Sequence, residues 1–230
     1  MLQPFKAVFF DAGGTLLHPF PSVGEIYRRV AAEHGCIVDA EATEKLFRES
    51  WLRRDGLSHL ASHSNEKIER EWWRGLVYEV FERLGEFKDF ETFFSELYDT
   101  FARPECWRLY PGTLELFAAL KKKNKTLGII SNWDSRLLIL CKGLGIEEYM
   151  DFILASAVFG ASKPSPKIFL EALRLAQVEP QEAVHIGDSM EDDIHGAMRV
   201  GIQAILINRH APRQGGGEGF GIIQDLKELI

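Results

Sequence analysis

The sequence has few cysteines, no excess of basic charge and no long apolar run. Its three cysteines, Cys36, Cys106 and Cys141, are far apart and odd in number, which indicates neither a disulfide framework nor a Cys-x-x-Cys metal or redox site. The 34 acidic residues outnumber the 27 basic ones, and no basic stripe suited to a nucleic-acid backbone is present, so no nucleic-acid partner is expected. No segment approaches the about 18 uninterrupted apolar residues of a membrane span, and the N-terminus lacks signal-peptide features. We therefore expect a soluble cytoplasmic protein without membrane association.

What is present is enough apolar material for a substantial core, at 46% of 230 residues. Short apolar runs predict strands at residues 5–10, 126–130, 152–155, 183–186 and 203–207. Helices are predicted between and around the later strands, near residues 112–123, 134–144, 165–176 and 190–200. Strands that alternate with helices are typical of right-handed crossover units under a parallel sheet. The expected fold class is therefore α/β, with a doubly wound, Rossmann-like parallel sheet.

A long helical segment interrupts this pattern after the first strand. Four helices are predicted there, from apolar residues at helical spacing, near residues 22–35, 39–56, 65–85 and 89–104. We expect an α/β core formed by residues 1–17 and 108–230, and an all-helical cap domain formed by residues 18–107. Hinges between them are expected near 17–21 and 105–111. The glycine-rich piece 215–221 is interpreted as a flexible surface loop, because it neither follows a strand directly nor leads into a helix bearing Lys-Ser/Thr.

Acidic residues follow two of the predicted strands. Asp11 ends the first strand, and Asp188, Asp192 and Asp193 follow the fourth. A carboxylate attacks an electrophilic phosphorus when a cation offsets the repulsion between the two anions. The three later acids repel one another unless a cation lies among them, and Mg²⁺ prefers carboxylate oxygens. Since ligands of such sheets bind beyond the carboxyl ends of the strands, the acids indicate a magnesium site there.

Two other strand ends carry polar groups suited to a phosphate. Ser131 and Asn132 follow the strand at 126–130, and the Ser131 hydroxyl with the Asn132 backbone amide could bind a phosphoryl oxygen. Lys163 would supply the positive charge that stabilises the transition state and restrains Asp11. Taken alone, Ser-Asn after a strand is usually a helix cap, and a lone Lys-Pro is ordinarily part of a surface loop.

Together, in this order, the segments at 11–16, 131–132, 162–166 and 187–193 are similar to the four-motif signature of the haloacid dehalogenase superfamily. The helical segment resembles that family's helical cap. The resemblance implies a magnesium-dependent hydrolase that cleaves a small phosphorylated molecule through an aspartyl-phosphate intermediate. Asp11 would be the nucleophile and a metal ligand, Asp188 would bind Mg²⁺, and Asp193 or Asp192 would support the metal. The chain is expected as a monomer or a homodimer.

One position departs from the family's phosphatases. These have a second aspartate, two residues after the nucleophile, that protonates the leaving alcohol and then activates water; here the position is Gly13. Its backbone carbonyl can still serve as the metal ligand that the family has there. General acid–base help is worth roughly 10²–10⁴-fold in rate, so we expect slow turnover of alkyl phosphate esters.

Several alternatives remain open at this point. A substrate with a good leaving group, such as an acyl or aryl phosphate, needs little protonation. A cap residue could instead donate the proton when the cap closes, and the candidates are His18, His34, His59 and His63.

Other reactions are also open. The family's 2-haloacid dehalogenases likewise lack an acid at the position of Gly13, but they generally work without metal, which the acidic segment at 187–193 argues against. The phosphonate-cleaving branch needs a Schiff-base lysine in the cap, and nothing in the sequence distinguishes Lys45, Lys67 or Lys88 as such a residue. The last alternative is a catalytically impaired protein that binds a phosphorylated ligand, or a partner through the aromatic residues of the cap.

Overall fold

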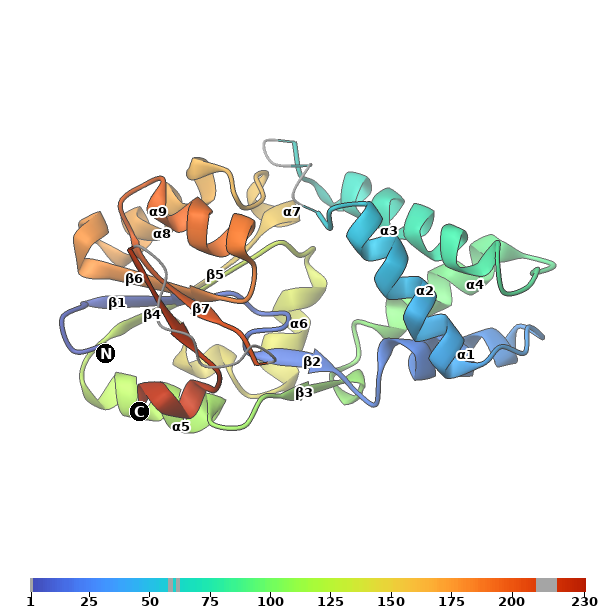
Figure 1. The fold of residues 1–230 in the computed structure, drawn as a ribbon, viewed down its shortest axis with the longest axis horizontal. Coiled ribbons are helices and arrows are strands. Elements are labelled where there is room, and N and C mark those ends of the chain that lie inside the picture. Colours follow the sequence, from blue (N-terminus) through green and yellow to red (C-terminus); the bar gives the residue numbers. More distant parts are fainter. Residues whose placement is uncertain (1, 58–59, 61–62, 210–218) are drawn as a thin grey trace.

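The computed structural model of the chain describes residues 2–57, 60, 63–209 and 219–230. Figure 1 shows a parallel sheet flanked by helices at one end of the molecule and a group of four helices at the other. The predicted histidine donor His59 and residues 215–218 of the predicted glycine-rich loop lie outside the described residues. Among the described residues, no helix is both long and apolar enough to cross a bilayer.

The sheet has six strands in the order β5-β4-β1-β6-β7-β8, and all neighbouring pairs are parallel. The strands are β1 (Ala7–Phe10), β4 (Thr126–Ser131), β5 (Phe152–Ala155), β6 (Ala183–Gly187), β7 (Gln203–Ile207) and β8 (Phe220–Ile223). The first five were predicted and are confirmed. The prediction was wrong for Phe220 and Gly221, which were placed in a loop but belong to the edge strand β8.

Side chains of β1 point alternately to the two faces of the sheet, and each face is covered by its own helices. Val8 and Phe10 pack in the core cluster of α5 and α6, whereas Ala7 and Phe9 pack in the cluster of α8 and α9. In Figure 1, α8 and α9 lie above the sheet and α5 below it. These helices are α5 (Thr113–Lys122), α6 (Arg136–Gly143), α8 (Pro166–Ala176) and α9 (Gly196–Met198). The expected doubly wound α/β fold is confirmed.

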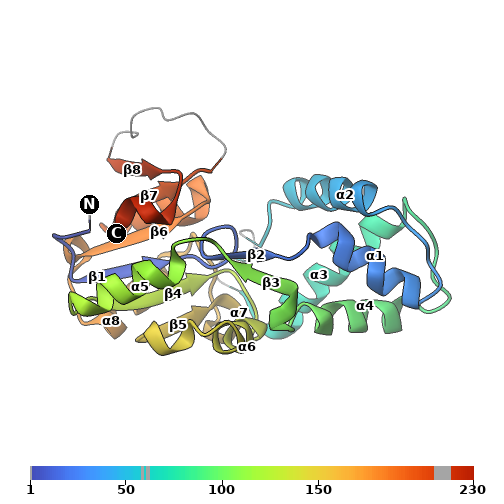
Figure 2. The same ribbon diagram turned by 90° about the horizontal axis from the view of Figure 1, so that it is seen from below.

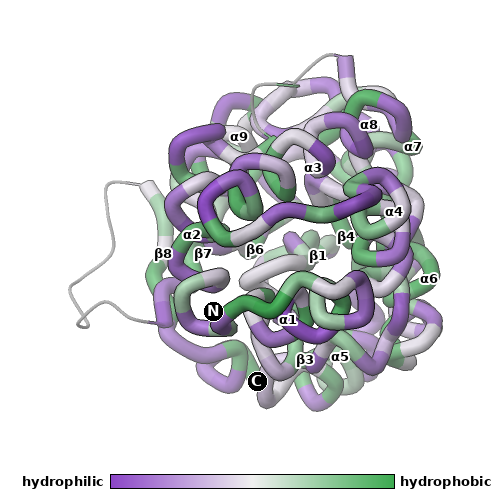
Figure 3. The backbone as a smooth tube through the Cα atoms, turned by 90° about the vertical axis from the view of Figure 1, so that its right-hand side faces the viewer, coloured by the Kyte–Doolittle hydropathy of each residue, from purple (hydrophilic) through white to green (hydrophobic). Residues whose placement is uncertain are grey.

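The four predicted helices of the inserted segment are present as α1 (Val23–Glu33), α2 (Ala40–Arg53), α3 (Glu66–Phe81) and α4 (Phe90–Thr100). Each begins after a side chain that accepts a hydrogen bond from a backbone N–H of the first turn, and these caps are Ser22, Asp39, Asn65 and Asp89. Hydrophobic and hydrophilic stretches alternate along the helices in Figure 3, as expected for helices with one buried face.

A two-stranded antiparallel sheet of β2 (Leu17–Pro19) and β3 (Trp107–Leu109) connects the helical segment to the α/β part (Figure 2). It lies where the hinges were predicted, and the exact domain limits stay a prediction. The remaining short elements are η2 (Pro104–Cys106), η3 (Glu147–Tyr149), α7 (Ser156–Phe159), η4 (Pro180–Glu182), the π-helical turn η5 (Met190–His195) and η6 (Leu226–Leu229).

Candidate active site

The polar residues predicted from separate strand ends meet at the carboxyl edge of the sheet. Asp11 follows β1, Ser131 ends the neighbouring strand β4, and Asp188 follows β6 on the other side. The Ser131 hydroxyl donates to Asp11 Oδ1 at 3.0 Å, and Lys163 Nζ donates to the same oxygen at 2.7 Å. Two donors therefore fix one oxygen of Asp11, while Oδ2 accepts no hydrogen bond from the residues that the structure describes.

Three carboxylates cluster here, since Asp11, Asp188 and Asp193 each offer an oxygen within 4.8 Å of the others. Asp188 is open to the pocket, yet protein surrounds it on most sides; this desolvation and the charges of Asp11 and Asp193 raise its pKa to about 8. Burial also raises the pKa of Asp11, against the opposing charge of Lys163. One ammonium does not neutralise three acids, so the cluster fits a hard divalent cation such as Mg²⁺. Asp192 lines the same pocket outside this cluster.

Asp193 is held by a set of donors that includes one residue absent from the sequence prediction. Its Oδ1 accepts from Lys163 Nζ at 2.6 Å and contacts His185 Nε2 at 2.9 Å, and its Oδ2 accepts from the Ser189 backbone at 3.0 Å. Burial opposes ionisation, but Lys163 and His185 together hold the pKa of Asp193 below its ordinary value. His185 is fully buried in β6. The sequence signal that could have identified His185 is that it is the one polar residue in the otherwise apolar strand β6.

Lys163 is positioned by Asn132. The Asn132 side chain donates to the Lys163 carbonyl at 2.9 Å and accepts from the Lys163 amide at 2.7 Å. The ammonium is buried, which by itself would lower its pKa, but the charges of Asp11 and Asp193 outweigh this and raise the pKa of Lys163. The Asn132 side chain thus orients the lysine, and the role predicted for its backbone amide in phosphate binding stays a prediction.

The turn after Asp11 depends on a glycine at position 14. Gly14 has a φ of +77°, and a Cβ there would overlap the Asp188 carboxylate. Arg209 donates to the carbonyl oxygens of Gly14 and Thr15, and its guanidinium lies 3.5 Å from the centre of the Tyr110 ring. The loop that carries the nucleophile is therefore fixed from the side of β7. The role of the Gly13 carbonyl as a metal ligand stays a prediction.

The space beside Gly13, where the missing acid would stand, is filled by an indole. A Cβ at Gly13 would lie 3.1 Å from Trp133 Cζ3. Among the described residues, the predicted substitute donors His18, His34 and His63 and the cap lysines Lys45, Lys67 and Lys88 do not line the pocket.

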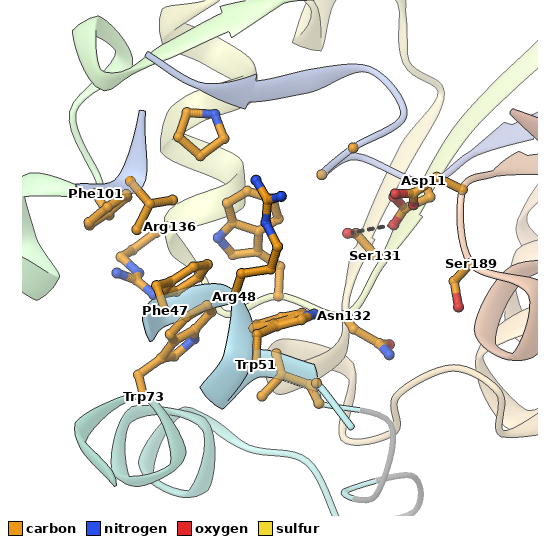
Figure 4. A pocket seen from close by; sticks show the side chains of 18 of the residues that line it. Asp11, Phe47, Arg48, Trp51, Trp73, Phe101, Ser131, Asn132, Arg136 and Ser189 are labelled. Atoms are coloured by element: carbon orange, nitrogen blue, oxygen red, sulfur yellow. Dashed lines mark hydrogen bonds between the residues drawn. The ribbon is translucent and has the colours of Figure 1, made fainter. Parts of the chain in front are cut away.

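The pocket encloses about 500 Å³ between the sheet edge and the helical segment. Its aromatic lining is Tyr27, Phe47, Trp51, Trp73, Phe94, Tyr98, Phe101, Trp107 and Trp133. Figure 4 shows Phe47, Arg48, Trp51 and Trp73 facing Asp11 and Ser131 across it. Of the cations that line the pocket, Arg136 is paired with Asp134 at 2.6 Å and Lys163 with the acids. Most of the wall is therefore apolar and aromatic, and the acidic cluster lies at one end.

Comparison with known proteins identifies the family of the chain. The sequence pattern of a family described as haloacid dehalogenase-like hydrolase matches residues 5–201. The chain is similar to haloacid dehalogenase-like hydrolase domain-containing protein 3 of Bos taurus, with 35% identity over 88% of this chain and 81% of the relative. It is also similar to the crystal structure of a HAD phosphatase from Thermococcus onnurineus, with 30% identity, a TM-score of 0.67, and 98% and 96% of the two chains covered.

A 2-haloacid dehalogenase from Pseudomonas syringae pv. Tomato is similar at 26% identity and a TM-score of 0.65, over 98% of this chain and 96% of that one. Phosphatase and dehalogenase relatives thus share the fold. The matched family spans most of the chain, including all four polar strand ends. The chain belongs to the haloacid dehalogenase-like hydrolases.

Proposed function

We propose that the protein is a magnesium-dependent phosphatase that hydrolyses a small phosphorylated molecule through an aspartyl-phosphate on Asp11. The observation that carries the proposal is the three-carboxylate cluster around a buried lysine. With one ammonium among three acids, ionisation of all three carboxyl groups would leave an excess of negative charge that a divalent cation would balance. A haloacid dehalogenase has no need for such a cation, so the cluster favours phosphoryl transfer.

Each residue has a role that follows from its contacts. Ser131 and Lys163 hold Asp11 Oδ1, which leaves Oδ2 to attack the phosphorus. Mg²⁺, held by Asp11, Asp188 and Asp193, would act as a Lewis acid that withdraws charge from the substrate phosphate. The Lys163 ammonium lies beside the attacking carboxylate and stabilises the charge that develops on the transferring group.

The helical segment would exclude water from the pocket during transfer. The Thermococcus onnurineus phosphatase, at 30% identity, supports this reading of the site. Because Gly13 offers no side chain for acid–base catalysis, turnover of alkyl phosphate esters is expected to be slow, by roughly 10²–10⁴-fold relative to an enzyme with the acid.

A single-turnover assay tests the proposal. Purified protein is mixed with acetyl phosphate in the presence and absence of Mg²⁺, and phosphate release and protein-bound phosphate are followed by rapid quench. We expect release that requires Mg²⁺ and disappears in Asp11→Asn. Ligand binding without release would instead indicate a binding protein, and metal-independent halide release from a 2-haloacid would indicate a dehalogenase.

A further inference from the structure

We propose that this site is built for aryl phosphates, and that Trp133 is the residue that determines this specificity. An aryl phosphate combines a flat apolar body with a leaving oxygen that departs without a proton donor. The inference rests on the proposed phosphatase function and adds the class of substrate to it.

The position of Trp133 is the first observation. Its six-membered ring edge lies over Gly13, with Cζ3 at 3.1 Å and Cε3 and Cη2 both at 3.9 Å from a Cβ built there. The indole packs on the Trp107 ring at 4.9 Å between ring centroids, and the Trp133 backbone amide donates to the Ser156 hydroxyl at 2.9 Å. A Cβ at position 13 would require this ring to shift by a few tenths of an ångström. The bulky indole therefore lies directly beside the position that lacks the proton donor.

The chemistry of the leaving group follows. In the first step Asp11 Oδ2 forms a bond to phosphorus, the bond from phosphorus to the aryl oxygen breaks, and the electron pair leaves on a phenolate. In the second step water attacks phosphorus, the bond to Asp11 breaks, and the carboxylate and dihydrogen phosphate are released. The phenolate takes its proton from that phosphate in solution. The first step needs no proton donor at position 13 when the leaving oxygen is a weak base, and kcat/KM reports this step. The second step lacks the side chain that would activate water, and this lack is the same for every substrate because all of them form the same aspartyl-phosphate.

The lining of the pocket indicates why the group attached to the phosphate would be an aromatic ring. Beyond the acidic cluster the walls are mainly apolar and aromatic, although Glu44, Arg48, Asp55 and Arg136 also line them. Trp51, Trp73 and Phe47 of the cap face the sheet edge (Figure 4). A flat ring attached to the phosphate would enter between these side chains and the Trp133 indole. Aromatic rings pack favourably against one another in offset or edge-to-face geometry, so these side chains favour a flat apolar body.

A series of substrates separates the effect of the leaving group from the effect of the aromatic ring. With the full chain and Mg²⁺, kcat and KM are measured for phenyl phosphates carrying different ring substituents, for benzyl phosphate and for acetyl phosphate. We expect kcat/KM to rise steeply with the acidity of the phenol, and benzyl phosphate to be slower than phenyl phosphate by at least about 100-fold. Acetyl phosphate, which has a good leaving group but no ring, should show a KM at least about 10-fold above that of phenyl phosphate.

Variants then assign the effect to Trp133. Trp133→Ala should raise KM for phenyl phosphate about 10-fold and change KM for acetyl phosphate by less than about twofold, whereas Trp133→Phe should stay close to the parent. Gly13→Asp should accelerate benzyl phosphate cleavage more strongly when combined with Trp133→Ala, which removes the contact of 3.1 Å at that position. Circular dichroism checks that each variant is folded, and the substrate series with the parent protein maintains the test if the alanine variant is not.

The outcomes are distinguishable from a failure of the proposed function. Equal kcat/KM for phenyl and benzyl phosphate, together with Asp11-dependent hydrolysis of acetyl phosphate, would overturn the aryl phosphate inference and leave the phosphatase in place. Equal KM values for acetyl and phenyl phosphate would also overturn it. If no member of the series released phosphate in an Asp11-dependent reaction, both the phosphatase function and the aryl phosphate specificity would be wrong.

Discussion

A buried glutamate between the cap helices and the α/β part offers a sharp test of the electrostatics of this structure. Glu69 in α3 is fully buried, and its Oε1 accepts from the hydroxyl of Ser64 and, at 2.5 Å, from that of Ser156 at the start of α7. Its Oε2 is buried without a hydrogen-bond partner among the described residues. Burial raises the pKa of Glu69 to about 7, although both serines oppose the shift.

The substitution Glu69→Gln removes this titration and keeps the oxygen that the serines contact. The folded protein holds a proton on Glu69 up to about pH 7, whereas the carboxyl in the unfolded chain loses it near its ordinary pKa of 4.5. Between these values the folded state binds more protons, so the free energy of unfolding falls as the pH rises. Since a tenfold change in proton affinity corresponds to about 1.4 kcal/mol, the full loss above pH 7 amounts to roughly 3 kcal/mol.

Urea unfolding of the two proteins at about pH 5 and about pH 8.5 measures the effect. Their midpoints should nearly coincide at the lower pH, and the variant should be more stable at the higher one by up to about 3 kcal/mol. Glu71→Gln, which changes an exposed acid of the same helix, should show no such dependence and serves as the control. A stability difference between Glu69→Gln and the parent that is the same at both pH values would refute the reasoning.

Three further predictions concern the site. Gly14→Ala should weaken Mg²⁺ binding at least about tenfold in calorimetric titration, because the new Cβ collides with Asp188; unchanged affinity would contradict the geometry. Asn132→Ala should lower kcat about 10- to 100-fold with little change in KM, since it frees the Lys163 backbone; a change confined to KM would point to substrate binding instead. Mg²⁺ affinity should rise up to tenfold per pH unit below about pH 8 and level off above it, because the metal displaces a proton from Asp188. Calorimetric titrations in buffers of different ionisation enthalpy count the protons released on binding. An Mg²⁺ affinity that does not change with pH would contradict this displacement.

The elements of the sheet were predictable because their signals are local. The apolar runs of β1, β4, β6 and β7 each stop at turn residues, and helical spacing fills the segments between them. β8 was not predicted because glycines precede and interrupt it. β2 and β3 were not predicted because three residues are too few to form a pattern. These strands exist through pairing with a neighbour.

Much of the site was predictable for a related reason. Parallel strands present their carboxyl ends at one edge, so polar residues that follow several strands must come together, even when Asp11 and Ser131 are 120 positions apart. The predicted roles of Asp188, Asp192 and Asp193 rested on the same logic, but only the structure separates Asp192 from the cluster that the other two form with Asp11.

The sequence by itself determined the parallel α/β core, the helical insertion, and the kinds of donor at each strand end, because periodicity and turn residues depend on near neighbours. The tertiary structure alone decided that Trp133 covers Gly13, that His185 supports Asp193, and that Glu69 reaches Ser156, 87 positions away. Such contacts join side chains from separate elements. Their identity depends on how helices and strands pack in three dimensions, which no local pattern records.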